Sequence, residues 1–173
     1  MIQTDRTKAV HFTGHRKIAG AYEGPAQTKL MEFLSKLVTT WAAAGWTTWI
    51  SGGAIGVDQI AMEAVQWAMV FGAPAKLVIA RPFPSQASKW PAKSQARFAT
   101  LCEFGEIVDV SPDPYTPQKM QVRNVWMVEN AIVTIACWDG TEKGGTWNCI
   151  QTARKVGNKI LHIHPVTLEA RWL

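Results

Sequence analysis

The chain has 173 residues, of which 47% are hydrophobic and 18% are charged, a composition that indicates a globular protein and excludes a disordered one. Its 18 lysines and arginines outnumber 13 aspartates and glutamates, and the resulting net charge of +5 suits a phosphate-bearing ligand. No apolar run approaches the roughly 20 residues that a membrane helix needs. Residues 1–6 lack the basic and then apolar pattern of a signal peptide. We therefore expect a cytoplasmic protein with no membrane partner.

Short apolar runs alternate with runs of helical periodicity along the whole chain. The first half is expected to hold, in order, a strand at 9–13, a helix at 30–41, a strand at 47–50, a helix at 57–71 and a strand at 76–80. The second half continues with a polar helix at 89–104, a strand at 106–110, a helix at 117–130, an apolar strand at 131–137, a helix at 144–157 and a strand at 159–164. For residues 166–173, packing on the sheet edge and contact with a partner both stay open.

This alternation predicts an α/β protein of the Rossmann-like, doubly wound type, with a mainly parallel sheet of about six strands and helices on both faces. The apolar strand at 131–137 has the pattern of a strand buried on both sides of a parallel sheet. No linker, repeat or low-complexity tract interrupts the pattern, so residues 1–173 are predicted to form a single domain.

Three of the predicted strands run into glycine-bearing turns. In a parallel α/β sheet these turns meet at the carboxyl edge, and ligands bind there near the point where the strand order reverses. Glycines let the backbone approach an anion, and the helix that follows offers free N–H groups and a partial positive charge. The turns are Thr13-Gly14-His15-Arg16, Ser51-Gly52-Gly53-Ala54-Ile55-Gly56-Val57-Asp58 and Asp139-Gly140-Thr141-Glu142-Lys143-Gly144-Gly145-Thr146.

Side chains in and near these turns suggest how the ligand is held. Arg16 and Arg123 are candidate phosphate clamps, because a guanidinium group matches phosphate with two hydrogen bonds. Asp58 accepts from a ribose hydroxyl or only favours the positive end of its helix, and the sequence leaves both open. The predicted ligand-binding residues are Thr13, Gly14, His15, Arg16, Ser51, Gly52, Gly53, Gly56, Asp58, Arg123, Asn124, Asp139, Gly144, Gly145 and Thr146.

The motifs taken together resemble the YpsA-like branch of the SLOG superfamily, which also includes the LOG phosphoribohydrolases and the DNA-processing protein DprA. The resemblance rests on the first two turns and on three later stretches, which are Pro82-Phe83 with Gln86 and Trp90, Arg123-Asn124 with Met127-Val128, and Trp138-Asp139-Gly140 with Gly144-Gly145-Thr146. It covers nearly the whole chain. The resemblance implies a Rossmann-like fold with a pocket for a nucleotide or a nucleotide-derived small molecule.

The resemblance to LOG enzymes is incomplete at one position. In those enzymes an arginine works with a glutamate that directly follows a GGxGT-like loop. Arg123 matches the arginine and residues 144–146 resemble the loop, but residues 147–151 contain no glutamate. The departure argues against phosphoribohydrolase activity and favours a binding or sensing module.

Three functions remain as alternatives, and the sequence leaves open whether the protein is an enzyme. The first is binding or sensing of a nucleotide-derived small molecule of ADP-ribose-like type. The second is hydrolysis of an N-glycosidic bond, for which Asp139 with Arg123 would be the catalytic pair. The third is DprA-like binding of nucleic acid, which the scattered basic residues argue against. Met120, Trp126 and Met127 indicate a packing face, although Trp126 and Trp90 could flank a base.

No cofactor or metal site is predicted. The three cysteines, Cys102, Cys137 and Cys149, show no CxxC spacing, and His162 and His164 have no third ligand near them in the sequence. The cysteines are expected to be reduced packing residues. A homo-oligomer stays open.

Overall fold

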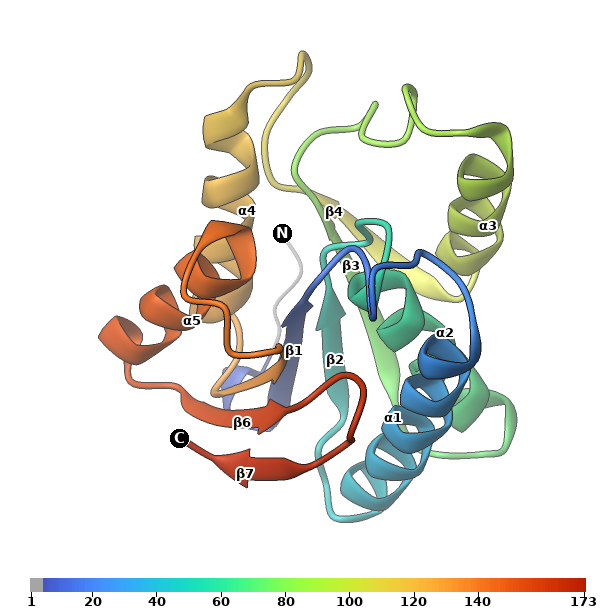
Figure 1. The fold of residues 1–173 in the computed structure, drawn as a ribbon, viewed down its shortest axis with the longest axis vertical. Helices are drawn as coiled ribbons and strands as arrows, with labels where there is room; N and C mark the ends of the chain where they lie inside the picture. Colours follow the sequence, from blue (N-terminus) through green and yellow to red (C-terminus); the bar gives the residue numbers. More distant parts are fainter. Residues whose placement is uncertain (1–4) are drawn as a thin grey trace.

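The computed structural model describes residues 5–173, and its centre is one seven-stranded sheet with strand order β4-β3-β2-β1-β5-β6-β7 (Figure 1). The first six strands are parallel, and the last is antiparallel to its neighbour. The strands are β1 (Ala9–Gly14), β2 (Thr48–Ser51), β3 (Lys76–Arg81), β4 (Gly105–Asp109), β5 (Val133–Cys137), β6 (Lys159–Ile163) and β7 (Ala170–Trp172).

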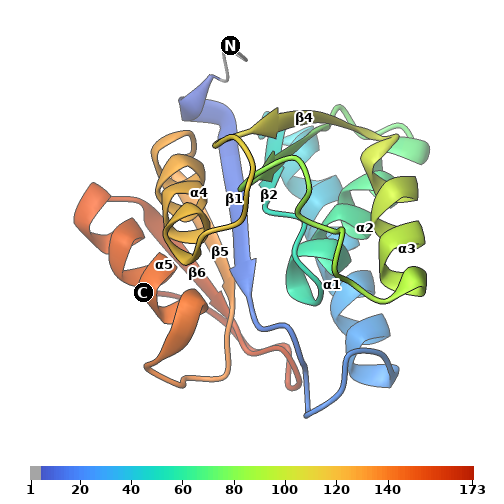
Figure 2. The same cartoon turned by 90° about the horizontal axis from the view of Figure 1, so that it is seen from above.

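Five helices cover the two faces of the sheet, and a short 3-10 helix (Arg6–Lys8) precedes β1. One face carries α1 (Pro25–Ala43), α2 (Val57–Val70) and α3 (Ala92–Cys102), and the other carries α4 (Pro117–Glu129) and α5 (Gly144–Val156) (Figure 2). The predicted Rossmann-like, doubly wound α/β fold is confirmed. None of the described helices is long and apolar enough to cross a membrane.

The burial of each strand follows from its place in the sheet. All of β5 is buried, because it lies near the centre with helices on both faces, whereas β4 is largely exposed at one edge. On the face of α1 and α2, Phe12 stacks on Trp49 with ring centroids 5.8 Å apart, and both side chains are fully buried. Small residues such as Ala61 and Ala64 on α2 let it pack closely against α1.

The strand order reverses at β1, and this feature positions the site. The chain runs outward from β1 through β2 and β3 to β4, and then α4 returns it to β5 on the opposite side of β1. The connections after β1 and β5 therefore leave toward opposite faces of the sheet. A crevice opens between them at the carboxyl edge, which is where proteins of this architecture bind ligands.

The structure adds one strand to the predicted sheet of about six strands. Residues 166–173, which the sequence left undecided, contribute the seventh strand, because β7 pairs with β6 and Trp172 stacks on Trp41 with centroids 6.0 Å apart. Helix bounds also differ. The first helix begins at Pro25 and not at residue 30, and the polar helix is shorter than 89–104 because residues 82–91 form a loop.

Candidate functional site

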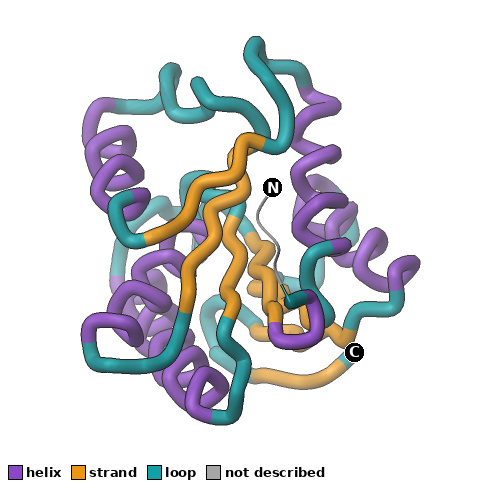
Figure 3. Tube along the Cα trace, turned by 180° about the vertical axis from the view of Figure 1, so that it is seen from behind, coloured by secondary structure: helices purple, strands orange, loops and turns teal. Residues whose placement is uncertain are grey.

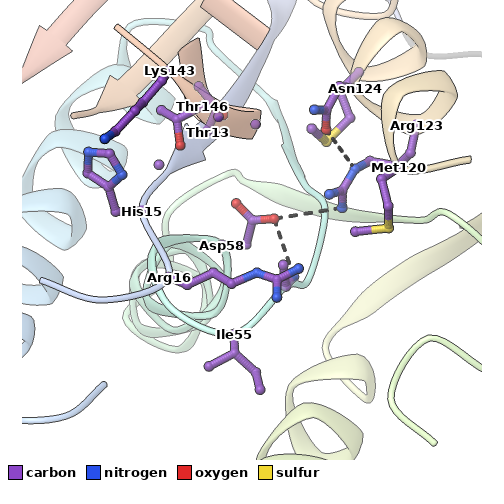
Figure 4. Close-up of a pocket in the computed structure, with 15 residues that line it drawn as sticks. Thr13, His15, Arg16, Ile55, Asp58, Met120, Arg123, Asn124, Lys143 and Thr146 are labelled. Carbon is purple, nitrogen blue, oxygen red and sulfur yellow. Dashed lines mark hydrogen bonds and ion pairs between the residues drawn. The ribbon is translucent and has the colours of Figure 1, made fainter. Parts of the chain in front are cut away.

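A cavity of about 390 Å³ lies at the predicted edge of the sheet, beside the carboxyl ends of β1 and β5 (Figure 4). Segments far apart in the sequence build it: the turn after β1, the loop before α2, the middle of α4 and the beginning of α5. The residues that line it are Thr13, Gly14, His15, Arg16, Ala54, Ile55, Asp58, Met120, Arg123, Asn124, Met127, Lys143, Gly144, Gly145 and Thr146.

Two glycines allow the turn after β1 to lie against the beginning of α2. A Cβ atom at Gly14 would stand 2.6 Å from Val57 Cγ1, and one at Gly56 would stand 2.5 Å from the carbonyl oxygen of His15. Gly56 also has φ of +101°, which favours glycine. The Val57 N–H donates to the His15 carbonyl over 3.0 Å. Both glycines are therefore needed for backbone packing that shapes the cavity.

Arg123 and Asp58 form a buried pair in the wall of the cavity (Figure 4). Arg123 is 5% exposed and Asp58 is 7% exposed. Arg123 Nη1 lies 3.7 Å from Asp58 Oδ2 and donates to the Gly52 carbonyl over 2.6 Å. A Cβ at Gly52 would overlap the guanidinium group, so the glycine leaves room for Arg123. Burial raises the pKa of Asp58, against the opposing effects of Arg123, the Ala54 N–H and Arg16. The guanidinium stays protonated at any ordinary pH.

One nitrogen of Arg123 is left for a ligand. Its Nε donates to Asn124 Oδ1 over 3.0 Å, and Nη1 is bound to Gly52 as described. Within residues 5–173, Nη2 has no hydrogen-bond partner. Arg123 thus combines a fixed position with a free donor at a cavity wall.

The beginning of α5 forms another wall. The helix starts at Gly144 without a side-chain cap, and the N–H groups of Gly144, Gly145 and Thr146 donate to no acceptor in the described part of the chain. A Cβ at Gly144 or Gly145 would meet nothing within 4 Å, so open space lies beside these groups. Lys143 and Arg16 also line the cavity. An uncapped helix N-terminus with cations around it is suited to an anion.

Asp139, the carboxylate predicted to be catalytic if the protein is a hydrolase, is not placed as that role requires. It does not line the cavity, and its Oδ1 is 2.9 Å from His15 Nε2 and accepts from the Thr141 N–H over 2.9 Å. Partial burial works to raise the pKa of Asp139, but the bonds from Thr141 and His15 outweigh it and lower the pKa to about 2. The carboxylate is an ionised turn residue that holds His15 in place.

The structure brings most of the predicted residues to one cavity, but not all. The predicted residues that do not line it are Ser51, Gly52, Gly53, Gly56 and Asp139. The Ser51 hydroxyl instead donates to the Asp58 carbonyl over 2.8 Å. The predicted residues that line the cavity are Thr13, Gly14, His15, Arg16, Asp58, Arg123, Asn124, Gly144, Gly145 and Thr146. Those that the prediction missed are Ala54, Ile55, Met120, Met127 and Lys143.

The missed residues left only weak signals in the sequence. Ala54, Ile55 and Lys143 lie inside turns that the prediction had singled out, but their side chains carry no pattern of their own. Met120 and Met127 fit the periodicity of a packing face. Met127 is indeed 1% exposed.

Reactive groups of other kinds are few around the site. Burial raises the pKa of Cys149 to about 11 and that of Cys137 to about 12, so both are neutral thiols at ordinary pH. His162 Nε2 lies 2.7 Å from the Trp138 carbonyl. Residues 5–173 contain no group of three or more side chains that could hold a metal ion.

The strand order and the polar crevice at its reversal define a Rossmann-like protein with a ligand-sized cavity at the switch point. Residues 10–170 match the model of the YspA SLOG family, and the chain belongs to that family. It is 30% identical over 151 residues to the SPbeta prophage-derived protein YoqJ of Bacillus subtilis (strain 168), covering 79% of this chain and 86% of that protein. A UPF0398 protein of Bacillus cereus (strain G9842) is 23% identical over 87% of this chain and 84% of its own length.

Among solved structures, the DNA processing protein A of Helicobacter pylori has a similar fold, with a TM-score of 0.63 and 20% identity. The match covers 90% of this chain and 64% of that protein, so the chain spans less than two thirds of its length. The Helicobacter pylori protein binds single-stranded DNA.

The expectation that nucleic acid is an unlikely partner is contradicted by this comparison. It rested on scattered basic residues, yet a protein of the same fold binds single-stranded DNA. The physical reason is that spacing along the chain does not report clustering in space. Arg16, Arg123 and Lys143 are far apart in sequence and line one cavity.

Proposed function

We propose that the protein binds a nucleotide or a nucleotide-derived small molecule, with a phosphate group of the ligand held at the beginning of α5. The observation that carries the proposal is a set of hydrogen-bond donors that have no acceptor within residues 5–173. These donors are the N–H groups of Gly144–Thr146 and Nη2 of Arg123. Two further cations, Arg16 and Lys143, line the same cavity. Both kinds of donor suit phosphate oxygens, and guanidinium binds them with defined geometry.

Binding accounts for the site better than hydrolysis does. Cleavage of an N-glycosidic bond needs a carboxylate near the reacting carbon to support positive charge or to activate water. Asp139 lies outside the cavity and is engaged by His15 and Thr141. Asp58 does line the cavity, but it is buried against Arg123 and accepts from the Ala54 N–H.

The proposal is tested by placing a negative charge where the phosphate would bind. Gly145→Asp adds a carboxylate at the beginning of α5, where space is open. A carboxylate there interacts favourably with the helix dipole, by about 0.3–1 kcal/mol, so the variant should fold at least as stably as the wild type. It should nevertheless lose binding of AMP and ADP-ribose, measured by thermal shift. A ligand at 100 times its Kd should stabilise the wild type by about 2.7 kcal/mol.

Ala92→Asp is the matched control, because it adds the same charge in the first turn of α3, outside the cavity. It should keep the ligand-induced shift. The screen includes inorganic phosphate, NAD and cyclic dinucleotides, and chromatography afterwards shows whether each compound stays intact. If Gly145→Asp binds AMP and ADP-ribose as the wild type does, the phosphate is not held at α5. Release of free base would make the protein a hydrolase.

A second candidate is binding of single-stranded nucleic acid, which the fold shared with the DNA processing protein A of Helicobacter pylori favours. The basic residues that gather at the cavity could contact a phosphate backbone. This function would show itself as affinity for an unlabelled oligonucleotide that falls steeply with salt, because phosphate contacts release counterions. Weak salt dependence together with tight AMP binding would favour the small molecule.

A further inference from the structure

A second cavity of about 490 Å³ adjoins the first, and Arg16, Ala54 and Met120 line both. Two loops contribute its remaining walls: residues 82–91, which follow β3, and residues 110–116, which follow β4 (Figure 3). The two cavities therefore adjoin at these three residues.

The two loops are fastened to each other and to α4. Asp113 Oδ1 accepts from the Ser85 hydroxyl over 2.5 Å and from the Ser85 N–H over 3.2 Å. Lys119 Nζ, on α4, donates to the carbonyls of Pro112 and Pro114, each over 2.6 Å. The walls of the second cavity are therefore held at a fixed spacing even though they are formed by loops.

Aromatic side chains line this second cavity. Phe83 is buried and meets Tyr115 edge to face, with ring centroids 5.7 Å apart, while Tyr115 is 57% exposed. Trp90 lines the cavity as well and packs its ring against Phe98 at 5.3 Å. Exposed and half-buried aromatic faces next to a phosphate site are suited to stacking on a nucleobase.

Gln86 supplies a polar group with an unmet hydrogen bond. It lines the second cavity, is 7% exposed, and donates through Nε2 to the Gly52 carbonyl over 3.0 Å. That same carbonyl accepts from Arg123 Nη1, so one backbone oxygen positions a side chain of each cavity. Gln86 Oε1 has no hydrogen-bond partner within residues 5–173. A buried acceptor without a donor is unfavourable, and a ligand N–H that reaches it after a shift of the surrounding cavity wall would satisfy it.

Resting on the proposed function, we propose that the second cavity holds the nucleobase of the ligand whose phosphate occupies the first. Tyr115 and Trp90 stack on the base, and Gln86 Oε1 accepts a hydrogen bond from an exocyclic amino group. The bond from Gln86 Nε2 to Gly52 fixes the orientation of the amide, so its oxygen is the atom left for the base. The ligand class is then an amino-bearing nucleotide such as an adenine nucleotide.

The test compares AMP with ribose 5-phosphate, which carries the phosphate and sugar without a base. The wild type should bind AMP about fiftyfold more tightly, because a stacked base contributes about tenfold and the hydrogen bond to Gln86 about fivefold. Tyr115→Ala should reduce that advantage by about tenfold while leaving ribose 5-phosphate binding unchanged. Tyr22→Ala is the matched control, because Tyr22 is similarly exposed, at 52%, and lines neither cavity.

The outcomes separate the two proposals. Equal affinity of the wild type for AMP and ribose 5-phosphate would overturn the base subsite and leave phosphate binding at α5 intact. Failure of both to bind would overturn the proposed function, and the base subsite with it. An AMP advantage that is as large in Tyr115→Ala as in the wild type would also overturn the assignment of the base to this cavity.

The role of Gln86 is tested with IMP, in which an oxygen replaces the amino group of AMP. The wild type should prefer AMP by about fivefold, the effect of one buried hydrogen bond. Gln86→Leu should bind the two nucleotides equally, and circular dichroism and thermal melting check that the variant is folded. A wild type that does not distinguish AMP from IMP would overturn the role of Gln86 in selection.

Discussion

At the scale of single residues, buried polar groups set the chemistry of this protein. His11 lies in β1 and is fully buried, with Nε2 2.7 Å from the Thr134 hydroxyl. Burial lowers its pKa to about 4, and the nearby Arg123 adds to the effect, while a bond to the Phe12 carbonyl opposes it. The imidazole is therefore neutral in the folded protein around pH 7.

This burial predicts a pH dependence of stability. His11 has an unfolded pKa near 6.5 and a folded pKa of about 4, so the unfolded chain takes up the proton first as the pH falls. The contribution of neutral His11 to the free energy of unfolding is fully present above pH 6.5 and is lost as the pH falls from about 6.5 to 4. The free energy of unfolding should fall over that range by up to about 3 kcal/mol more in the wild type than in His11→Gln. Urea unfolding at several pH values measures it, and parallel pH profiles would contradict it.

At the scale of elements, the small edge strand β7 is fixed by a contact that is distant in sequence. It forms three residue pairs with β6, including Leu161 with Trp172, and its own residues are exposed. The stack of Trp172 on Trp41 of α1, with planes 11° apart, joins this edge of the sheet to the helix layer. An isolated three-residue strand has little stability of its own, so the ring contact must help to hold it.

Trp172→Ala should therefore lower the free energy of unfolding by about 1 kcal/mol. Trp67→Ala is the comparison, because Trp67 of α2 is similarly exposed and stacks on Phe71 at the end of that helix, with ring centroids 5.4 Å apart. A pair four residues apart on a helix contributes only about 0.2–0.5 kcal/mol. Urea midpoints of the two variants give the difference. Equal losses would mean that β7 is not fixed by Trp41.

At the scale of the whole molecule, the switch point joins two halves of the sheet that meet at β1 and β5. The cavities draw on the turn after β1 and the loop before α2 from one half, and on α4 and the beginning of α5 from the other. A ligand bound across them would contact both halves at once. Binding would then be coupled to the packing of the molecule as a unit.

Hydrogen–deuterium exchange with AMP tests this expectation. Exchange should slow in residues 13–16, 52–58 and 143–147, and in the loop segments 83–90 and 113–116, because bound ligand satisfies or covers their N–H groups. Residues 166–173 lie outside both cavities and serve as the internal control. Protection confined to one half would mean that the ligand does not span the switch point.

The sequence by itself determined the α/β alternation, the parallel sheet and the edge at which the cavity lies. These features depend on local information, namely hydrophobic periodicity and glycine placement, and parallel βαβ connections then bring the turns to one edge. The turns at residues 13–16 and 144–146 were predicted as binding residues for this reason, and both line the cavity.

Only the tertiary structure decided which residues in those turns face the cavity and which support it. Gly52 holds Arg123, Gly56 packs against His15, and Asp139 is tied to His15 and Thr141, so none of the three lines it. The sequence pattern likewise did not predict the seventh strand or the hydrogen bonds that link Arg123 through Gly52 to Gln86. The hydrogen bond from Gln86 to Gly52 spans 34 positions and the contact of His15 with Asp139 spans 124, and no local periodicity reports contacts of such length. They arise only when the chain packs.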